Sequence, residues 1–218
     1  MARRFELLVF DWDGTVSDST GSIVLALQAA CRDLDLPIPS DAQANYVIGL
    51  GLAEALSRIA PTLPVEQQPL LVARYRHHYL AADQQIQTFK GIQTLIQDLY
   101  DSGHLLAVAT GKSRQGLERA FASSGLGKFF TSSRCADECF SKPHPQMLEE
   151  LMDELAVGPE QTLMIGDTTH DMQMANNAGV AGLAVTYGAH ERADLELLNP
   201  LACLDDVIQL SLWLKRNA

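Results

Sequence analysis

The sequence predicts an α/β protein whose core is a doubly wound, Rossmann-like parallel sheet, with a small all-helical cap inserted after the first strand. Three observations support this fold class. Short apolar runs have the character of strands buried on both faces. Helical patterns separate most of these runs, as βαβ units require. One long block, from about residue 20 to residue 83, has helical patterns and no convincing strand.

The expected strands are nearly uninterrupted in apolar character, and they lie at residues 6–10, 105–110, 162–166 and 182–186. A strand with one exposed face would alternate apolar and polar residues, so these runs favour a sheet covered by helices on both sides. Between the strands, helical patterns span residues 92–99, begin again near Leu117, and span residues 147–155. This alternation predicts a doubly wound sheet.

The helical block contains an apolar stripe over residues 23–34 that is closed by Pro37 and Pro39, and two further patterns at 52–59 and 65–82. It lies between the first strand and the helix that would normally follow that strand. An insertion there is predicted to cap the C-terminal edge of the sheet, where ligands bind in open α/β folds. We therefore expect an α/β core domain of residues 1–17 and 84–218 and a helical cap domain of residues 18–83.

Composition limits the classes of function. The chain has 218 residues, 47% hydrophobic residues and a net charge of −11, and an acidic chain of this kind is a poor nucleic-acid binder. No apolar run reaches the length of a membrane span, and the N-terminal run is too short for a signal peptide. The four cysteines lack the spacing of a disulfide framework or zinc site. We expect a cytoplasmic monomer or weak homodimer that binds a small phosphorylated metabolite, with no nucleic acid and no membrane as partner.

The stretch LLVFDWDGT places two carboxylates, Asp11 and Asp13, at the tip of the first strand. Residues two apart in an extended chain point to the same side. The two acids would repel each other there unless a cation or a shared proton lies between them. A turn would explain Asp13 followed by Gly14, because Asp-Gly is a strong turn signal. A turn leaves Asp11 without a role.

Other polar groups follow the later strands, namely Thr110, Gly111, Lys142, Asp167 and Asp171. A hydroxyl and free backbone N–H groups at a helix start can hold an anion. Each residue taken alone also fits a structural role, as a turn, a surface lysine or an acid in the first turn of a helix. Their common position at strand ends favours a phosphate site.

In this order and spacing, the motifs resemble those of the haloacid dehalogenase superfamily, in its phosphoglycolate-phosphatase-like branch with a helical cap. Motif one is residues 11–15, motif two is Thr110, motif three is Lys142, and motif four is residues 166–171. The resemblance covers essentially the whole chain. It implies a Mg²⁺-dependent phosphatase that hydrolyses a small, phosphoglycolate-like phosphomonoester through an aspartyl-phosphate intermediate.

The resemblance also implies roles for single residues. Asp11 would be the nucleophile, and Asp13 would protonate the leaving oxygen and later activate water. Thr110 and Lys142 would hold the transferring phosphoryl oxygens, with Gly111 beside them. Mg²⁺ would take oxygens from Asp11, the Asp13 backbone carbonyl and Asp167. Asp171 would support that shell from outside or through water.

In the cap, residues 47–51 resemble the family's glycine-bearing specificity loop, and Arg58 follows at a position where related phosphatases often carry a basic residue. The resemblance therefore implies that Gly49 and Arg58 contact the substrate. Two departures stand out. Gly111 occupies a position where many relatives have Asn, and Leu50 is apolar where phosphoglycolate phosphatases often have a polar residue. These differences leave the chemistry intact but weaken the case for phosphoglycolate itself as the substrate.

Two other functions share this core chemistry. A phosphoglucomutase-like phosphoryl transferase would need a cap that binds a sugar phosphate, and no obvious set of sugar-binding residues is present. A non-enzymatic phospho-aspartate switch also places acids at the ends of parallel strands. Receiver domains of that kind have neither a helical cap nor the Asp-x-Asp pair, which disfavours the switch here.

Overall fold

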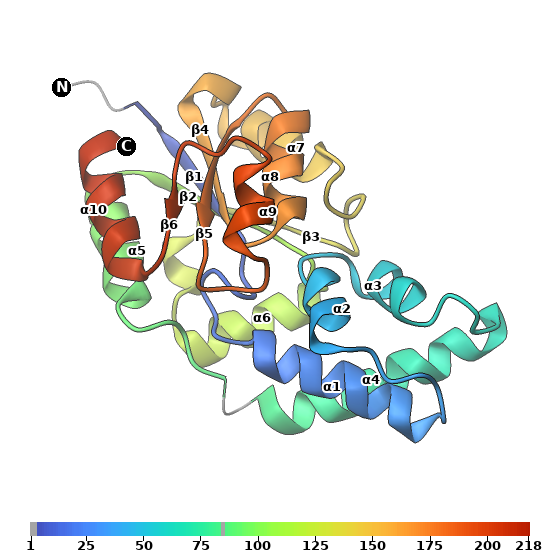
Figure 1. Cartoon of the computed structure of the whole chain (residues 1–218). Coiled ribbons are helices and arrows are strands. Elements are labelled where there is room, and N and C mark those ends of the chain that lie inside the picture. The colour runs from blue at the N-terminus through green and yellow to red at the C-terminus, as the bar shows by residue number, and fades with distance from the viewer. Residues whose placement is uncertain (1–3, 84–85) are drawn as a thin grey trace.

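The computed structural model describes residues 4–83 and 86–218. Within them, parallel strands form one six-stranded sheet in the order β3-β2-β1-β4-β5-β6, with helices on both faces (Figure 1). The strands are β1 (Leu7–Phe10), β2 (Leu105–Thr110), β3 (Ser132–Cys135), β4 (Thr162–Gly166), β5 (Ala181–Val185) and β6 (Cys203–Leu204). The predicted doubly wound α/β fold is therefore confirmed.

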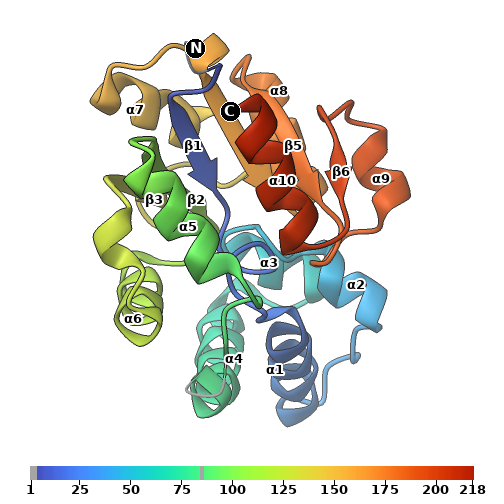
Figure 2. The same ribbon diagram turned by 90° about the vertical axis from the view of Figure 1, so that its left-hand side faces the viewer.

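The central strand β1 shows how the sheet is covered. Its alternate residues Leu8 and Phe10 pack in the apolar core beneath α5 (Ile92–Asp101) and α10 (Val207–Asn217). Its other residues, Leu7 and Val9, pack in a second core with side chains of α7 (Gln146–Leu155) and α8 (Thr169–Asn177). The two views show these helix pairs on opposite faces of the sheet (Figures 1 and 2). Both faces are buried, which is why the strand has no polar alternation.

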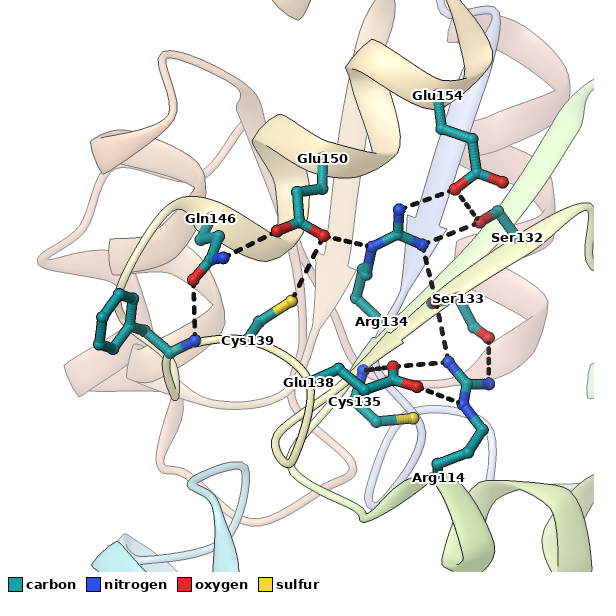
Figure 3. Close-up of polar contacts among 11 residues, drawn as sticks. Arg114, Ser132, Ser133, Arg134, Cys135, Glu138, Cys139, Gln146, Glu150 and Glu154 are labelled. Atoms are coloured by element: carbon teal, nitrogen blue, oxygen red, sulfur yellow. Dashed lines mark hydrogen bonds and ion pairs between the residues drawn. The ribbon is translucent and has the colours of Figure 1, made fainter.

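The two edge strands, β3 and β6, were not predicted. β3 has the polar sequence SSRC with one buried residue, and β6 has only two residues. Arg134 of β3 donates to Glu150 at 2.6 Å and to Glu154 at 2.8 Å, both on α7 (Figure 3). These charged contacts explain the polar sequence, because an edge strand needs little apolar surface and is protected by charge from pairing with other chains.

The loop that follows β3 is anchored by a second arginine. Arg114, the first residue of α6 (Arg114–Ser124), donates to Ser133 Oγ at 2.7 Å and forms two hydrogen bonds with Glu138, at 2.8 and 2.7 Å (Figure 3). The Glu138 side chain in turn accepts from the backbone N–H of Cys135 at 3.1 Å. The chain that leads to Lys142 is therefore held close to the end of the sheet.

The helical block comprises α1 (Thr20–Asp33), α2 (Asp41–Tyr46), α3 (Leu52–Ile59) and α4 (Gln68–Ala82), and it lies at the C-terminal ends of the strands (Figures 1 and 2). It has its own apolar core, with Leu27, Leu56 and Leu71 among its most buried side chains. Helix α2 was not predicted, although Ser40 and Gln43 form a capping box at its start. The predicted pattern at 65–82 is a short 3₁₀ turn followed by α4.

The two chain segments that enter and leave the block lie side by side. Ser17 forms an antiparallel bridge with Thr88, and the N–H of Asp18 donates to the carbonyl of Gln87 at 2.9 Å. The division into domains at residues 17/18 and 83/84 stays a prediction, and residues 1–3, 84 and 85 of the expected core domain lie outside the described residues. No helix in the described part of the chain is long and apolar enough to cross a membrane.

The short helix α9 (Arg192–Glu196) contacts the edge strand β6.

Candidate active site

Asp11 and Asp13 follow the last residue of β1, and the chain bends at Trp12 between them. The N–H of Asp11 donates to the carbonyl of Ile165 at 2.9 Å, which keeps the chain beside β4. Trp12, between the two acids, is 2% exposed and packs against Phe121 with ring centroids 5.2 Å apart. The indole is buried in the core, and the acids on either side of it in the chain lie at the end of the sheet.

Lys142 lies between two carboxylates. Its Nζ is 2.5 Å from Asp11 Oδ1 and 2.7 Å from Asp171 Oδ1. The three side chains are between 0% and 1% exposed. Burial of this ion cluster is tolerable because each charge has an opposite charge at hydrogen-bond distance. An ammonium group has three donors, so one N–H of Lys142 remains for a further acceptor.

The Asp171 carboxylate contacts Lys142 and the N-cap residue of α8. Its Oδ2 accepts from the backbone N–H of Thr168 at 3.0 Å and from Thr168 Oγ1 at 2.6 Å, which forms a capping box. Both carboxylate oxygens are thus engaged. A Cβ atom at position 166 would lie 2.4 Å from the Asp171 carboxyl carbon, so only glycine leaves room for this arrangement. Asp171 therefore orients Lys142.

Asp167 is held on both of its oxygens. Oδ1 accepts from Thr15 Oγ1 at 2.7 Å, and Oδ2 accepts from the backbone N–H of Ala189 at 2.8 Å. A Cβ atom at Gly14 or at Gly188 would lie 2.1 Å from Asp167 Oδ2. The two glycines leave space beside the carboxylate that a side chain would fill. Each carboxylate oxygen has a second lone pair, so Asp167 keeps acceptor capacity.

The acids of this cluster fit a divalent cation. Ligand oxygens of Asp11, Asp167 and Asp171 lie within 4.8 Å of one another. Asp11 Oδ2 is buried and has no hydrogen-bond partner among the described residues. Burial raises the pKa of Asp11 to about 7, although Lys142 opposes this rise, and burial raises the pKa of Asp167 well above its ordinary value. A cation bound to carboxylate oxygens, the ligands of Mg²⁺, would stabilise both ionised forms.

Asp13 lies apart from that cluster and faces a different lysine. Its Oδ1 accepts from Ser19 Oγ at 2.5 Å and lies 2.9 Å from Lys112 Nζ. Thr110, buried at the end of β2, accepts from the backbone N–H of Lys112 at 3.2 Å. Lys112 was not predicted as a site residue, because in the sequence it only opens a helix after Gly111. Nothing in its local pattern indicates the contact with Asp13.

A cavity of about 590 Å³ lies between the strand ends and the helical block. Asp13, Gly111 and Lys112 line it from the sheet side. Gly49 lines it from the block.

Arg58 is not among the residues that line this cavity. Its guanidinium pairs with Glu54 at 2.7 Å, one helical turn away, and the side chain is 42% exposed. The structure therefore does not bring Arg58 to the site in the way the sequence suggested. Arg76 and Arg119 line the cavity instead, and neither was predicted.

His170 links motif four to the helical block. Its Nε2 lies 2.8 Å from the carbonyl oxygen of Tyr46, the last residue of α2. The Tyr46 ring also stacks on His190, with centroids 5.6 Å apart and ring planes 7° apart. The sequence indicated no role for these histidines, and the contacts make them part of the junction between α2 and the sheet.

The structure explains why glycine occupies position 111, where many relatives have asparagine. A Cβ atom at this position would lie 2.4 Å from the carbonyl oxygen of Leu50 and 2.6 Å from that of Gly49. The loop of residues 47–51 therefore lies directly against the backbone of motif two. On the other side of the loop, the N–H of Gly51 donates to Ser141 Oγ at 2.8 Å.

Gly111→Ala is expected to lift the loop of residues 47–51 from motif two and to lower kcat/KM about tenfold or more, because overpacking a tight contact costs about 1–3 kcal/mol. Steady-state kinetics on an aryl phosphate would measure this loss. Gly21→Ala is the matched control, since a Cβ at position 21 of α1 meets no atom within 4 Å. Equal kinetics for both variants would contradict the close approach.

Comparisons with known proteins agree with this geometry. The haloacid dehalogenase-like hydrolase family matches residues 8–185. A curated relative from Dickeya dadantii named "Probable phosphatase IndB" is 34% identical over 205 residues, which cover 91% of this chain and 89% of that protein. A phosphoglycolate phosphatase from Vibrio cholerae is 29% identical over 215 residues, covering 94% of this chain and 95% of that protein.

A solved structure of a hydrolase from Pseudomonas syringae superposes with a TM-score of 0.88 over 97% of this chain and 98% of that chain, at 22% identity. At that identity the superposition establishes the shared fold. The family match extends over most of the sequence and includes the four strand-end motifs assembled here. The chain therefore belongs to the haloacid dehalogenase-like hydrolases and is a hydrolytic enzyme.

Proposed function

We propose that this enzyme is a phosphatase that hydrolyses a small phosphomonoester, phosphoglycolate-like in its chemistry, through an aspartyl-phosphate on Asp11. The observation that carries the proposal is a buried carboxylate with one oxygen on Lys142 and the other without a partner among the described residues. A second acid, Asp13, lies two residues on and lines the adjoining cavity. The phosphatase names of the relatives support the same chemistry.

The reaction divides into two displacements. A carboxylate oxygen of Asp11 attacks phosphorus, the bond from phosphorus to the leaving oxygen breaks, and Asp13 gives its proton to that oxygen. Water then attacks the phosphorus of the aspartyl-phosphate and gives a proton back to Asp13. The bond between phosphorus and Asp11 breaks, and inorganic phosphate leaves.

Lys142 and Thr110 would hold the phosphoryl oxygens during both steps. The third N–H of Lys142 is the donor that Asp11 and Asp171 leave free. Mg²⁺ would be held by Asp11, Asp167 and the backbone carbonyl of Asp13, with Asp171 outside this shell, and would supply positive charge to the phosphoryl oxygens. We further propose that the enzyme works in the cytoplasm as a monomer or weak homodimer, on a small metabolite and on neither nucleic acid nor membrane.

Release of inorganic phosphate tests the proposed function. With Mg²⁺, the enzyme should hydrolyse 4-nitrophenyl phosphate and some members of a panel of small phosphomonoesters, and EDTA should abolish turnover. Full activity in EDTA would contradict the metal assignment. Transfer of the phosphoryl group to added sugar phosphates in place of release would identify a phosphoryl transferase. A long-lived acyl-phosphate without turnover would identify a switch.

Thermal unfolding tests the metal site without activity. The raised pKa of Asp11, about 7, means that metal-free protein is stabilised by the protonated carboxyl at low pH and loses this stability as pH rises through 7. Mg²⁺ binds the ionised form, so it should raise Tm more at pH 8 than at pH 5. At about 100 times Kd the gain is about 2.7 kcal/mol, or on the order of 5–10 °C.

The matched pair for this measurement is Asp167→Asn and Asp18→Asn. Asp167 is fully buried in the cluster, whereas Asp18 is exposed at the start of the helical block. The first variant should lose the Mg²⁺-dependent shift, and the second should keep it. A shift that is independent of pH, or that survives in Asp167→Asn, would disprove this site.

A further inference from the structure

We propose that Lys112 is a positioning residue that couples the helical block to the proton-transfer acid. The proposal rests on the proposed function, because it takes Asp13 to be that acid. Three side chains form a continuous chain of contacts. Asp13 Oδ1 lies 2.9 Å from Lys112 Nζ, and Lys112 Nζ donates to the Tyr79 hydroxyl at 2.9 Å.

The first link fixes one oxygen of Asp13. Ser19 donates a hydrogen bond to Oδ1, and Lys112 Nζ forms an ion pair with the same oxygen at 2.9 Å, whereas Oδ2 has no hydrogen-bond partner among the described residues. A carboxyl group held on one oxygen presents the other in a defined direction, which is what proton transfer to a leaving oxygen requires. Because Asp13 lines the cavity, we assign Oδ2 as the oxygen that exchanges the proton.

The second link depends on the helical block. Lys112 follows β2 and belongs to the sheet, whereas Tyr79 is on α4 of the block. The ammonium also lies 5.0 Å from the centroid of the Tyr79 ring. Side chains of Asp13 and Lys112 are only 12% and 11% exposed, and Tyr79 is 8% exposed. All three side chains are therefore largely shielded from bulk solvent, and the position of the ammonium depends on both of its partners.

Movement of the block away from the sheet would remove Tyr79 from Lys112, which would then lose one of its two side-chain partners. Asp13 would then lose a defined ammonium position. The acid is therefore fully oriented only when α4 lies over the strand ends. This coupling ties proton transfer to a closed cavity, from which bulk water is excluded.

The test compares two substrates in Lys112→Met. 4-Nitrophenyl phosphate has a good leaving group and needs little protonation, whereas a simple alkyl phosphate needs the acid. We expect kcat for the alkyl phosphate to fall about 10- to 100-fold and kcat for the nitrophenyl ester to change about threefold or less. Lys112→Arg should recover part of the loss. Lys128→Met is the control, because Lys128 contacts Phe129 in a different part of the chain.

Tyr79→Phe tests the coupling itself. It should lower kcat for the alkyl phosphate in the same way but by less, and it should add nothing when combined with Lys112→Met. If Lys112→Met does not fold, the comparison of the two substrates is made in Tyr79→Phe. Absence of a leaving-group-dependent loss in Tyr79→Phe would then overturn the proposal.

Three results would overturn the proposal in well-folded variants. The first is an equal loss of kcat for both substrates. The second is a set of additive losses in the double variant. The third is a rise in KM with kcat unchanged. The last result would make Lys112 a substrate-binding residue. Failure of the wild-type enzyme to release phosphate from either ester would instead contradict the proposed function.

Discussion

Asp11→Asn is expected to abolish turnover, with a loss of kcat on the order of 10⁴-fold or more, the scale seen when a catalytic group is removed. The amide is a poor nucleophile and offers the cation one weaker ligand. The variant should also fail to take up covalent phosphate. Acid-quenched enzyme, analysed by intact-protein mass spectrometry after brief mixing with substrate, measures the aspartyl-phosphate directly.

Two variants control this experiment. Asp18→Asn makes the same chemical change at an exposed position and should keep both activity and labelling. Asp13→Asn should keep labelling by 4-nitrophenyl phosphate, because formation of the aspartyl-phosphate from a good leaving group needs little acid catalysis. Labelling of Asp11→Asn at the wild-type level would place the nucleophile elsewhere and refute the proposed mechanism.

Lys142→Met should reduce both activity and stability. Its ammonium is 0% exposed and contacts Asp11 and Asp171. Removing one partner of a buried ion pair costs about 3–5 kcal/mol in the free energy of unfolding, because the other charge stays buried without compensation. Loss of the donor to the phosphoryl oxygen should lower kcat by about 10²- to 10³-fold or more. Urea unfolding and phosphate release measure the two effects.

The stability loss in Lys142→Met has a predicted pH dependence. Burial raises the pKa of Asp11 to about 7 while Lys142 lowers it, so the variant should hold the Asp11 proton to higher pH. A raised pKa in the folded state means that stability falls as pH rises through that pKa. The difference between wild type and variant should therefore widen above pH 7. Lys215→Met, at an exposed ion pair with Asp98, should show neither effect.

The central strands and the catalytic edge of the sheet were predictable because strong local rules act there. β1, β2 and β4 are nearly uninterrupted apolar runs, which a sheet buried on both faces accommodates. The C-terminal ends of parallel strands meet at one edge, so Asp11 and Asp167 could be brought together from their positions at strand ends, whereas Lys142 was assigned to the site through the family resemblance. The structure places all three in or beside one cluster.

The remaining features depend on contacts between distant segments. β3 could not be recognised from SSRC, because its side chains are satisfied by Glu150 and Glu154 of α7 and carry no apolar pattern. The two side-chain partners of Lys112, Asp13 and Tyr79, both lie far from it in the sequence. Arg58 was expected at the substrate from its place in the cap, yet its neighbour Glu54 pairs with it on the helix surface.

The antiparallel bridge between Ser17 and Thr88 has a consequence for protein engineering. Because the chain enters and leaves the helical block at adjacent points, exchange of the segment between them for another insert, or for a tight turn, is expected to leave the pairing of β1 and β2 unchanged. The Ser17–Thr88 bridge is therefore a suitable junction for inserting segments of different length. Exchanging such segments would alter which molecules reach the catalytic edge while the strands beneath it keep their register.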